Sequence, residues 1–333
     1  MPKFLVIRFS SIGDIVLTSP IVRCIKQQIP GAEVHYLTKK AFLPVAQAIG
    51  HTDKIYSIES DIQEVMDALK KEAYDFIVDL HHNLRTMQVK RALKKESAAF
   101  PKLNIEKWLM VNLRINRLPN LHIVDRYFET VDSLGVENDD KGLEYHIPQG
   151  EEVDLKGLPA AHRDGYVGFV IGANHYTKQL PAHKIISICE QIDMPVVLLG
   201  GKNDQAKAFE LERAIGAKIF NACGKYTIHG SASLVRQAKK IITHDTGLMH
   251  IAAAFKKDII SVWGNTIPEF GMSPYKPGLN SHIVEVKGLS CRPCSKIGYK
   301  ACPKKHFKCM EQIDEDAIEK LIRNLKSGII LST

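Results

Sequence analysis

A carboxylate follows the first apolar run of the sequence. After the run 4–9 come Ser11, Gly13 and Asp14, and then an amphipathic stretch that predicts a helix. In parallel α/β folds the residues just after a strand face the ligand, and a glycine lets the backbone approach it closely. Asp14 is therefore a candidate for direct contact with a ligand. In the alternative interpretation, Ser11 or Asp14 only caps the helix.

A second motif spans residues 243–254, where the run KIIT ends in a polar turn and small residues begin a helix. The free N–H groups at such a helix start can bind a diphosphate, with the closest contacts from Thr246 and Gly247. His250 lies one helical turn after Thr246, so the two side chains can share a face. The alternative is an ordinary strand–turn–helix connection capped by Asp245.

A third motif, GANHYTKQLP, spans residues 172–181 and follows the first strand predicted in the second half. Thr177 and Lys178 could neutralise phosphate charge there without a metal. A lone lysine on a loop is usually only solvated, so this interpretation depends on the other two motifs. The GxGxxG fingerprint is absent, which argues against a dehydrogenase.

Four cysteines fall within nineteen residues near the end of the sequence, with His306 among them. Cys291 and Cys294 have zinc-knuckle spacing, whereas Cys302 and Cys309 do not. A structural zinc site and a set of unliganded thiols are the two alternatives for this cluster, and a catalytic thiol is disfavoured.

The net charge of +8 is concentrated in residues 84–117, which hold nine basic and two acidic residues. Such a stretch could lie on an anionic lipid surface, hold the phosphates and carboxylates of a substrate, or form a solvated helix face. A nucleic-acid surface is disfavoured, because no nucleic-acid-binding motif accompanies the charge.

The composition indicates a globular protein. The chain has 333 residues, 45% hydrophobic and 25% charged, which is enough for two domains. Its amino-terminal apolar run is broken by Arg8 and Asp14, is too short to span a membrane and lacks a cleavage site. Cys24, Cys189 and Cys223 are isolated in apolar contexts and resemble reduced core residues. We therefore expect a cytoplasmic protein.

Short β-branched runs alternate with helical stretches, which predicts an α/β fold with buried parallel strands. The predicted strands are 4–9, 33–37, 54–58 and 76–80 in the first half and 166–172, 195–200, 240–245 and 258–264 in the second. Each half would be a doubly wound Rossmann-like domain, and ligands should bind in a cleft between the two.

The predicted domain boundaries follow from the same pattern. The first domain covers residues 1–150 and the second covers 165–310, joined by a Gly-, Pro- and charge-rich linker at 146–165. Residues 311–333 contain a terminal helix with apolar residues at helical spacing, which we expect to pack back on the first domain.

In their order along the chain, five segments resemble glycosyltransferase family 9, the ADP-heptose:lipopolysaccharide heptosyltransferases. The segments are SSIGD, GANHYTKQLP, LLGGKND, NACGKYT and HDTGLMHIAAAF. The resemblance covers most of the chain and implies the GT-B fold, in which two Rossmann-like domains face each other across a cleft. The amino-terminal domain then holds the acceptor and the carboxyl-terminal domain holds the nucleotide-sugar.

The resemblance also implies roles for individual residues. Asp14 matches the catalytic base of the family. The residues implied for the donor nucleotide and its diphosphate are Thr177, Lys178, Asp204, Tyr226, Asp245, Thr246, Gly247 and His250. Those implied for the acceptor are Ser11, Gly13, Arg85 and Arg126. The sequence departs from the family pattern at Asp204, where glutamate is common, and at 263–266, where Trp-Gly-Asn-Thr replaces a Gly-Pro-Thr form.

These roles describe an inverting transfer that requires no cofactor. The expected partners are ADP-heptose or a related nucleotide-sugar and a lipid-linked saccharide acceptor of the lipopolysaccharide inner core, with peripheral contact to the inner face of the inner membrane and no nucleic acid. Two rival interpretations use the same scaffold: a nucleotide-sugar epimerase and a non-catalytic nucleotide-sugar-binding protein.

Overall fold

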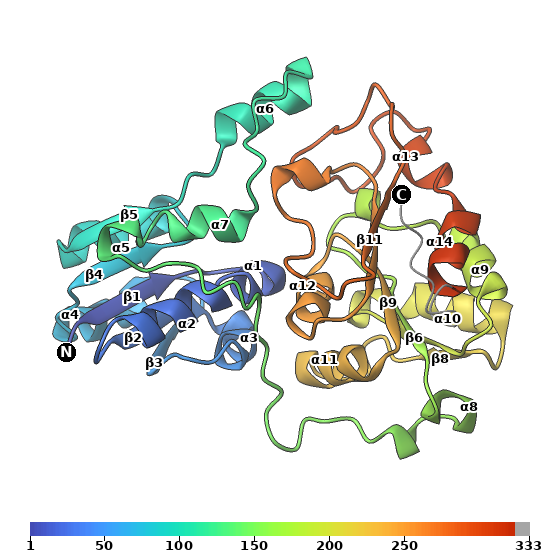
Figure 1. Cartoon of the computed structure of the whole chain (residues 1–333), viewed down its shortest axis with the longest axis horizontal. Coiled ribbons are helices and arrows are strands. Elements are labelled where there is room, and N and C mark those ends of the chain that lie inside the picture. The colour runs from blue at the N-terminus through green and yellow to red at the C-terminus, as the bar shows by residue number, and fades with distance from the viewer. Residues whose placement is uncertain (324–333) are drawn as a thin grey trace. The chain divides into compact units, whose positions relative to one another are not determined.

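The computed structural model describes residues 1–323 and divides them into two compact units (Figure 1). Unit 1 comprises residues 1–104 and 119–148, and unit 2 comprises 105–118 together with the described residues from 149 onward. The main difference from the predicted boundaries is that residues 105–118 belong to unit 2. Most of the predicted linker 146–165 also belongs to unit 2, since the second segment of that unit begins at Gln149.

Unit 1 is built on a five-stranded sheet whose paired strands are all parallel, in the order β3-β2-β1-β4-β5. Its strands are β1 (Lys3–Ile7), β2 (Glu33–Lys39), β3 (Lys54–Ile58), β4 (Phe76–Asp79) and β5 (Glu96–Ala99). The central strand β1 is buried on both faces from Phe4 to Ile7, as expected of a parallel sheet covered by helices.

The helices of unit 1 connect these strands. They are α1 (Ile12–Val16), α2 (Ser19–Gln28), α3 (Leu43–Ala48), α4 (Gln63–Lys71), α5 (Leu84–Leu93) and α7 (Ile123–Phe128), with short 3-10 turns η1 (Lys40–Phe42) and η2 (Asp132–Leu134). Local signals set their ends. At the start of α5, for example, the Asn83 side chain accepts a hydrogen bond from Thr86 N at 3.0 Å, which satisfies a free N–H group of the first turn.

Unit 2 is built on a six-stranded sheet, again with parallel pairing throughout, in the order β11-β10-β9-β6-β7-β8. Its strands are β6 (Val167–Val170), β7 (Val196–Leu199), β8 (Ile219–Asn221), β9 (Lys240–His244), β10 (Ile259–Trp263) and β11 (His282–Glu285). Both sheets have the strand order of a doubly wound fold, so the predicted fold class is confirmed.

The helices of unit 2 are α6 (Asn104–Leu113, all but its first residue), α8 (Ala160–Arg163), α9 (Ala182–Gln191), α10 (Gln205–Ile215), α11 (Ile228–Gln237), α12 (Gly247–Ala254), α13 (Lys308–Glu311) and α14 (Glu315–Arg323). The 3-10 turns are η3 (Leu155–Gly157), η4 (Tyr176–Lys178), η5 (Lys202–Asp204) and η6 (Pro268–Phe270). No helix among residues 1–323 is both long enough and apolar enough to cross a membrane.

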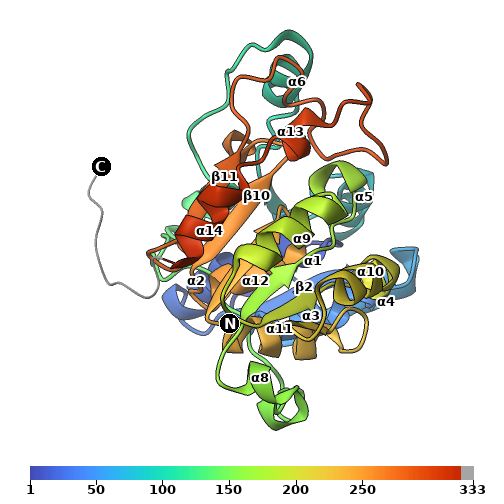
Figure 2. The ribbon, with the colours of Figure 1, turned by 90° about the vertical axis from the view of Figure 1, so that its right-hand side faces the viewer.

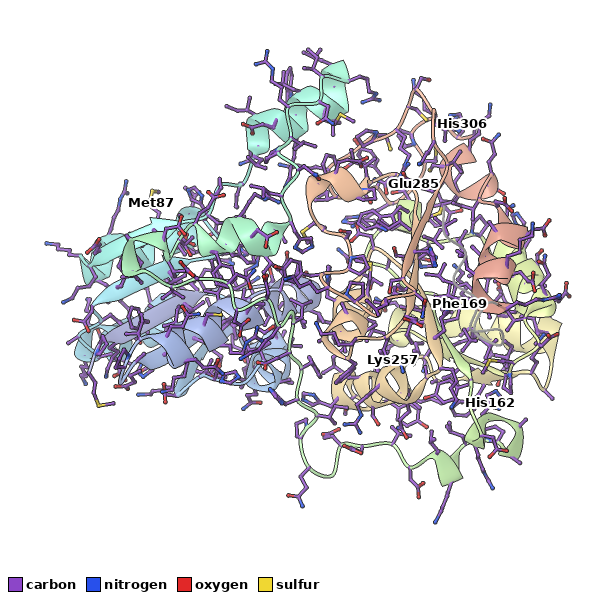
Figure 3. The ribbon with its side chains drawn as sticks, in the orientation of Figure 1. Met87, His162, Phe169, Lys257, Glu285 and His306 are labelled. Carbon is purple, nitrogen blue, oxygen red and sulfur yellow. The ribbon has the colours of Figure 1, made fainter. Side chains whose placement is uncertain are left out.

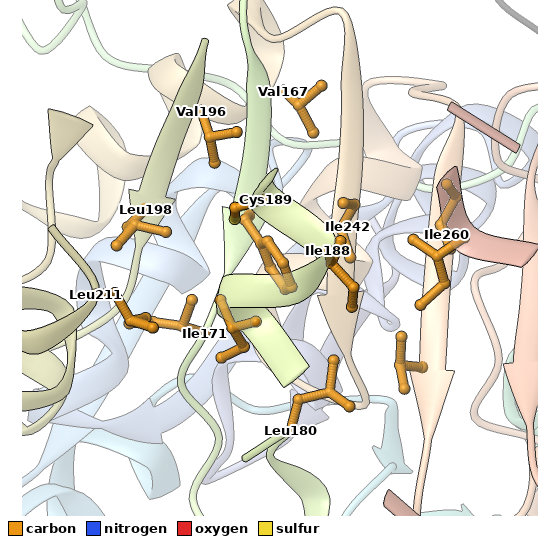
Figure 4. Close-up of a cluster of buried hydrophobic side chains, with 14 of the residues drawn as sticks. Val167, Ile171, Leu180, Ile188, Cys189, Val196, Leu198, Leu211, Ile242 and Ile260 are labelled. Atoms are coloured by element: carbon orange, nitrogen blue, oxygen red, sulfur yellow. The ribbon is translucent and has the colours of Figure 1, made fainter. Parts of the chain in front are cut away.

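The main core of unit 2 lies between α9 and the sheet. Ile188 and Cys189 of α9 point toward strand side chains that include Val167, Leu198 and Ile242 (Figure 4). Each of these five residues is fully buried. This packing fixes the carboxyl ends of the central strands, where the predicted site residues lie.

The terminal helix packs differently from the prediction. Helix α14 lies beside α9 in both views (Figures 1 and 2), and its Ile318 and Ile322 belong to the core of unit 2. Lys184 on α9 also pairs with Glu315 at 2.8 Å. The apolar stripe of the helix is therefore buried within unit 2 rather than on the first domain. The rest of the predicted helix, 324–333, lies outside the described residues.

Candidate active site

In unit 1 the switch point of the sheet lies between β1 and β4, and Asp14 follows β1. Asp14 is the third residue of α1, and its Oδ2 accepts hydrogen bonds from Ser11 N at 3.0 Å and Ser11 Oγ at 2.7 Å. Its Oδ1 lies 2.6 Å from Arg8 Nη2. The carboxylate thus caps the helix and also lies at the carboxyl end of the sheet, so the two interpretations of this motif do not exclude each other.

Arg8 connects the segment after β1 with the segment after β4. Its Nε donates to Ser10 O at 2.8 Å, and its Nη1 donates to Leu80 O just after β4. Burial disfavours the charge on both Arg8 and Asp14, but their mutual attraction and the Ser11 hydrogen bonds outweigh it. The pKa of Asp14 is therefore lowered and the pKa of Arg8 is raised. Asp14 is ionised at neutral pH.

His81, which the sequence analysis did not select, lies beside this ion pair. Its ring packs edge-on against Phe9, with 5.3 Å between the ring centroids. Burial and then the nearby Arg8 charge lower the pKa of His81 to about 4, so the imidazole is neutral at pH 7. One signal in the sequence could have identified His81. It directly follows the predicted strand 76–80, and that strand lies next to β1 in the sheet.

The four predicted acceptor residues differ in their exposure to solvent. Ser11 is exposed beside Asp14, Gly13 is buried within α1, and Arg85 lies half-buried in the first turn of α5. Arg126 is buried in α7, and its Nη1 donates to Pro101 O at 3.2 Å. Burial lowers the pKa of Arg126. A structural role of Arg126 is therefore visible, and its contact with an acceptor stays a prediction.

In unit 2 the switch point lies between β6 and β9, and the structure brings two of the predicted residues together there. Lys178 on η4 forms an ion pair with Asp245, which follows β9. Asp245 Oδ2 also accepts a hydrogen bond from Thr266 Oγ1 at 3.2 Å. Three loops, each at the carboxyl end of a different strand, thus converge on one carboxylate.

Helix α12 begins directly after this carboxylate. Thr246 is its N-cap residue with extended backbone, Gly247 is its first residue, and His250 is buried one turn later. The first N–H groups of a helix carry a partial positive charge and favour an anion. The N–H groups at the start of α12 and the Lys178 ammonium group, which is paired with Asp245, are thus the donors available to an anion at this end of β6 and β9.

Two residues that the sequence analysis missed form hydrogen bonds with the loop that carries Lys178. Leu180 N donates to His244 Nε2 at 2.9 Å, and Lys207 Nζ donates to Leu180 O at 2.7 Å. Burial lowers the pKa of His244 to about 3 and that of Lys207 to about 8. Thr177 in the same loop is also structural, because its Oγ1 accepts from Tyr299 N at 2.8 Å and donates to Tyr299 O.

Asp204 lies at the carboxyl ends of β6 and β7, and glycines make room for it. Its Oδ2 accepts from Gly201 N at 2.8 Å. A β-carbon at Gly172 would overlap the Asp204 carboxylate, and one at Gly200 would lie 2.9 Å from its Oδ2. Tyr226, the predicted adenine-packing residue, is half-buried just before α11. Both assignments to the nucleotide stay predictions.

Residues 62–305 match the family model of glycosyltransferase family 9 (heptosyltransferase). The chain belongs to this family. Among its curated relatives, lipopolysaccharide heptosyltransferase 1 of Campylobacter coli is 22% identical, over 97% of this chain and 98% of the relative. Lipopolysaccharide heptosyltransferase 3 of Escherichia coli K12 is 24% identical, over 76% of this chain and 80% of the relative.

Solved structures show the same fold for this family 9 glycosyltransferase. The ADP-heptose lipopolysaccharide heptosyltransferase II of Escherichia coli has a TM-score of 0.72 at 18% identity, over 97% of this chain and 98% of that chain. The family 9 glycosyltransferase of Veillonella parvula has a TM-score of 0.77 at 19% identity, over 97% of each chain. The predicted family and the GT-B fold class are thereby confirmed.

The four cysteines of this family 9 chain lie near one another, since burial and then the nearby charges of Cys291 and Cys302 raise the pKa of both Cys294 and Cys309. Cys291 Sγ lies 3.8 Å from His306 Nε2, while Cys309 is buried and belongs to the hydrophobic core. Within residues 1–323, the groups of three or more candidate ligand atoms within 4.8 Å of one another are elsewhere, at His51–Glu144–His146 and Glu33–His35–Glu72, and neither includes a cysteine. Zinc binding by the four cysteines stays a prediction.

The basic stretch 84–117 is shared between the two units. Its first part, which includes Lys90, belongs to unit 1, where Lys90 Nζ pairs with the buried Asp79 at 2.9 Å. Residues 105–118 belong to unit 2. The charge that appears continuous in sequence is therefore divided between two folded units.

Proposed function

We propose that this enzyme is an inverting heptosyltransferase that moves heptose from ADP-heptose to a lipid-linked acceptor of the lipopolysaccharide inner core. The observation that carries the proposal is the Asp14 carboxylate, kept ionised by Arg8 and Ser11 at the carboxyl end of β1. The names of the relatives support the sugar and the acceptor class. One similar solved structure is an Escherichia coli heptosyltransferase with ADP, which supports the donor nucleotide.

Asp14 would act as the general base. As the acceptor hydroxyl oxygen attacks the anomeric carbon, its proton passes to an Asp14 carboxylate oxygen. The bond between the anomeric carbon and the diphosphate oxygen breaks on the opposite face, and ADP leaves with the electron pair. A single displacement of this kind inverts the anomeric centre.

Lys178 and the start of α12 would stabilise the leaving diphosphate. The Lys178 ammonium group and the N–H groups of Thr246 and Gly247 supply positive charge where negative charge develops. In the described structure Asp245 pairs with Lys178, so the incoming diphosphate would compete for that lysine. We propose that these groups suffice without a metal cofactor, and we therefore expect full activity in the presence of a chelator.

A zinc ion at the cysteine cluster would then be structural only. Elemental analysis of protein purified without chelators measures its occupancy. About one zinc per chain would support a structural site, and zinc-free protein of unchanged melting temperature would support unliganded thiols. A chelator-induced loss of turnover that is reversed by a divalent cation would contradict metal-independent transfer.

The substitution Asp14→Asn tests the mechanism. We expect it to lower turnover by about 10²–10⁴-fold and to leave ADP binding unchanged, because the nucleotide residues lie in the other unit. Asp53→Asn is the matched control, since it removes another ion-paired carboxylate of unit 1, 2.7 Å from Lys26 Nζ. Wild-type turnover by the Asp14→Asn enzyme would overturn the assignment.

Donor and acceptor specificity can be separated from the mechanism. Thermal unfolding with a panel of nucleotides and nucleotide-sugars should show the largest stabilisation with ADP forms, because a ligand that binds only the folded state raises its apparent stability. Incubation with ADP-heptose should release ADP only when the lipid acceptor is present. Isomerisation of the donor without acceptor would indicate an epimerase, and binding without any reaction would indicate a non-catalytic protein.

We also propose that the enzyme works in the cytoplasm, at the inner face of the inner membrane. Its nucleotide-sugar is water-soluble and its lipid-linked acceptor is not, so the reaction requires both environments. Fractionation of cells should recover the protein partly with inner membranes and release it with high salt.

A further inference from the structure

One surface of unit 2 combines two segments that are far apart in the sequence. The first is the arm, residues 105–118, which includes nearly all of α6, and the second is the loop 290–308. Arg114 Nε donates to Ser290 O at 3.0 Å, so the two segments are in contact. Figure 2 shows α6 beside the loop. A pocket of about 440 Å³ lies between them, lined by Val111 of the arm and Tyr299 of the loop among others.

The arm exposes a row of large apolar side chains. Ile105, Trp108 and Leu113 are 72%, 54% and 53% exposed. At about 100° per residue, the three side chains span roughly 140° of the helix surface, which is a broad apolar stripe. No residue of α6 is buried. Val111 and Asn112 line the pocket toward the loop, and beside them Ile105, Trp108 and Leu113 each remain more than half exposed.

The loop beside the arm is rich in lysine. Between residues 290 and 308 there is no Asp or Glu. Its exposed lysines are Lys296, Lys300, Lys304, Lys305 and Lys308. The one arginine, Arg292, is neutralised by Glu285 at 2.6 Å, and Figure 3 shows Glu285 at the end of β11 and His306 in the loop itself. This concentration of positive charge adds to Arg114 and Arg117 of the arm.

We propose that the arm and the loop together form a docking surface for an anionic lipid bilayer. Ile105, Trp108 and Leu113 would enter the boundary between headgroups and acyl chains, where a tryptophan ring is favoured, and the lysines would contact the anionic headgroups. An apolar face flanked by lysines is the pattern expected of an interfacial helix.

The charge and the side-chain types favour a bilayer over other occupants. A second copy of the chain would bring the two lysine-rich loops toward each other, and like charges at an interface are unfavourable. A nucleic acid would use aromatic side chains for base stacking, and of the three apolar side chains named above only Trp108 is aromatic, whereas Ile105 and Leu113 are aliphatic. Self-association and nucleic-acid binding are therefore outcomes that contradict the proposal.

The two tryptophans of the chain allow a direct test. Trp108 is exposed, whereas Trp263 is 1% exposed and gives a constant background. The wild-type protein, without donor or acceptor, is titrated with vesicles of phosphatidylglycerol and phosphatidylethanolamine while tryptophan emission is recorded. We expect a blue shift with these vesicles and none with pure phosphatidylcholine. The shift should disappear in Trp108→Phe.

Charge variants identify the loop as part of the surface. Replacing Lys300, Lys304 and Lys305 together by glutamine should weaken vesicle binding by about 100-fold, at roughly five-fold per cationic residue. Replacing Lys70, Lys71 and Lys156 by glutamine is the matched control, because it removes the same charge at exposed positions elsewhere. We expect the control to bind vesicles like the wild type.

Several results would overturn the proposal. These are an absent blue shift with anionic vesicles, a shift that persists in Trp108→Phe, and equal binding by the two triple variants. A blue shift caused by self-association in sedimentation experiments, or by oligonucleotides alone, would assign the surface to another partner. The titration contains neither substrate, so its failure would leave the proposed transfer reaction untouched.

Discussion

Removing the charge of Arg8 tests whether Asp14 reacts as a base. Arg8 Nη2 lies 2.6 Å from Asp14 Oδ1, and both side chains are mostly buried. An arginine at this distance lowers a carboxyl pKa by about 1–3 units. Arg8→Met removes this attraction but retains the two hydrogen bonds from Ser11. The acid limb of kcat/KM against pH should therefore move upward by about 1–3 pH units.

The same substitution should change stability with a defined sign. The pKa of Asp14 is lowered in the folded protein, so its ionisation stabilises the fold above the unfolded pKa near ~4 and this contribution is lost as the pH falls through the folded pKa. The free energy of unfolding of Arg8→Met should thus be lower than that of the wild type by roughly 3 kcal/mol at neutral pH. This difference in the free energy of unfolding between the wild type and Arg8→Met should become smaller at acid pH.

The assay is the initial rate of ADP release at limiting donor, measured across pH at constant ionic strength. Arg8→Lys is the control, because it keeps a positive charge but cannot reproduce the hydrogen bonds to Ser10 O and Leu80 O. We expect its acid limb to lie between those of wild type and Arg8→Met. A folded Arg8→Met enzyme with the wild-type acid limb would refute Asp14 as the titrating base.

Three further substitutions test other parts of the structure. Gly172→Ala should displace the Asp204 carboxylate and weaken ADP binding by about 10-fold. Gly157→Ala should leave ADP binding unchanged, because a β-carbon at Gly157 would point into open space. Isothermal titration of ADP measures the affinity of both variants. Lys178→Met should lower kcat by about 10²-fold in steady-state assays, through loss of charge stabilisation, and an unchanged kcat would remove it from the mechanism. Ile318→Ala should destabilise unit 2 by about 2–5 kcal/mol in denaturant unfolding, because it opens a cavity between α14 and α9, while the fully exposed Leu279→Ala should have almost no effect.

The central strands of both sheets are predictable from the sequence. All eight predicted strands are present. Seven of them are central, and a strand buried on both faces needs a continuous apolar run, whereas the eighth, β3, lies at an edge. The strands that the sequence analysis missed are β5, β8 and β11, and each lies at the edge of its sheet. An edge strand such as β5, with the sequence ESAA, is partly exposed and carries no apolar run. Its pairing is decided by the neighbouring strand.

Some features of the candidate site could likewise be predicted from the sequence, and others could not. Asp14, Lys178 and Asp245 follow predicted strands, so their place at the carboxyl ends of the sheets follows from the α/β pattern. The sequence could not show that Thr177 is used by the backbone of Tyr299, since 122 residues separate the two.

The sequence by itself determined the doubly wound fold and the strand ends that carry Asp14, Lys178 and Asp245, because these depend on local patterns of a few residues. Only the tertiary structure decided that Arg8 is buried against Asp14 and that the arm 105–118 meets the loop 290–308, across 176 residues between Arg114 and Ser290. Contacts of this kind depend on how packed elements bring distant segments together, and no local periodicity encodes them.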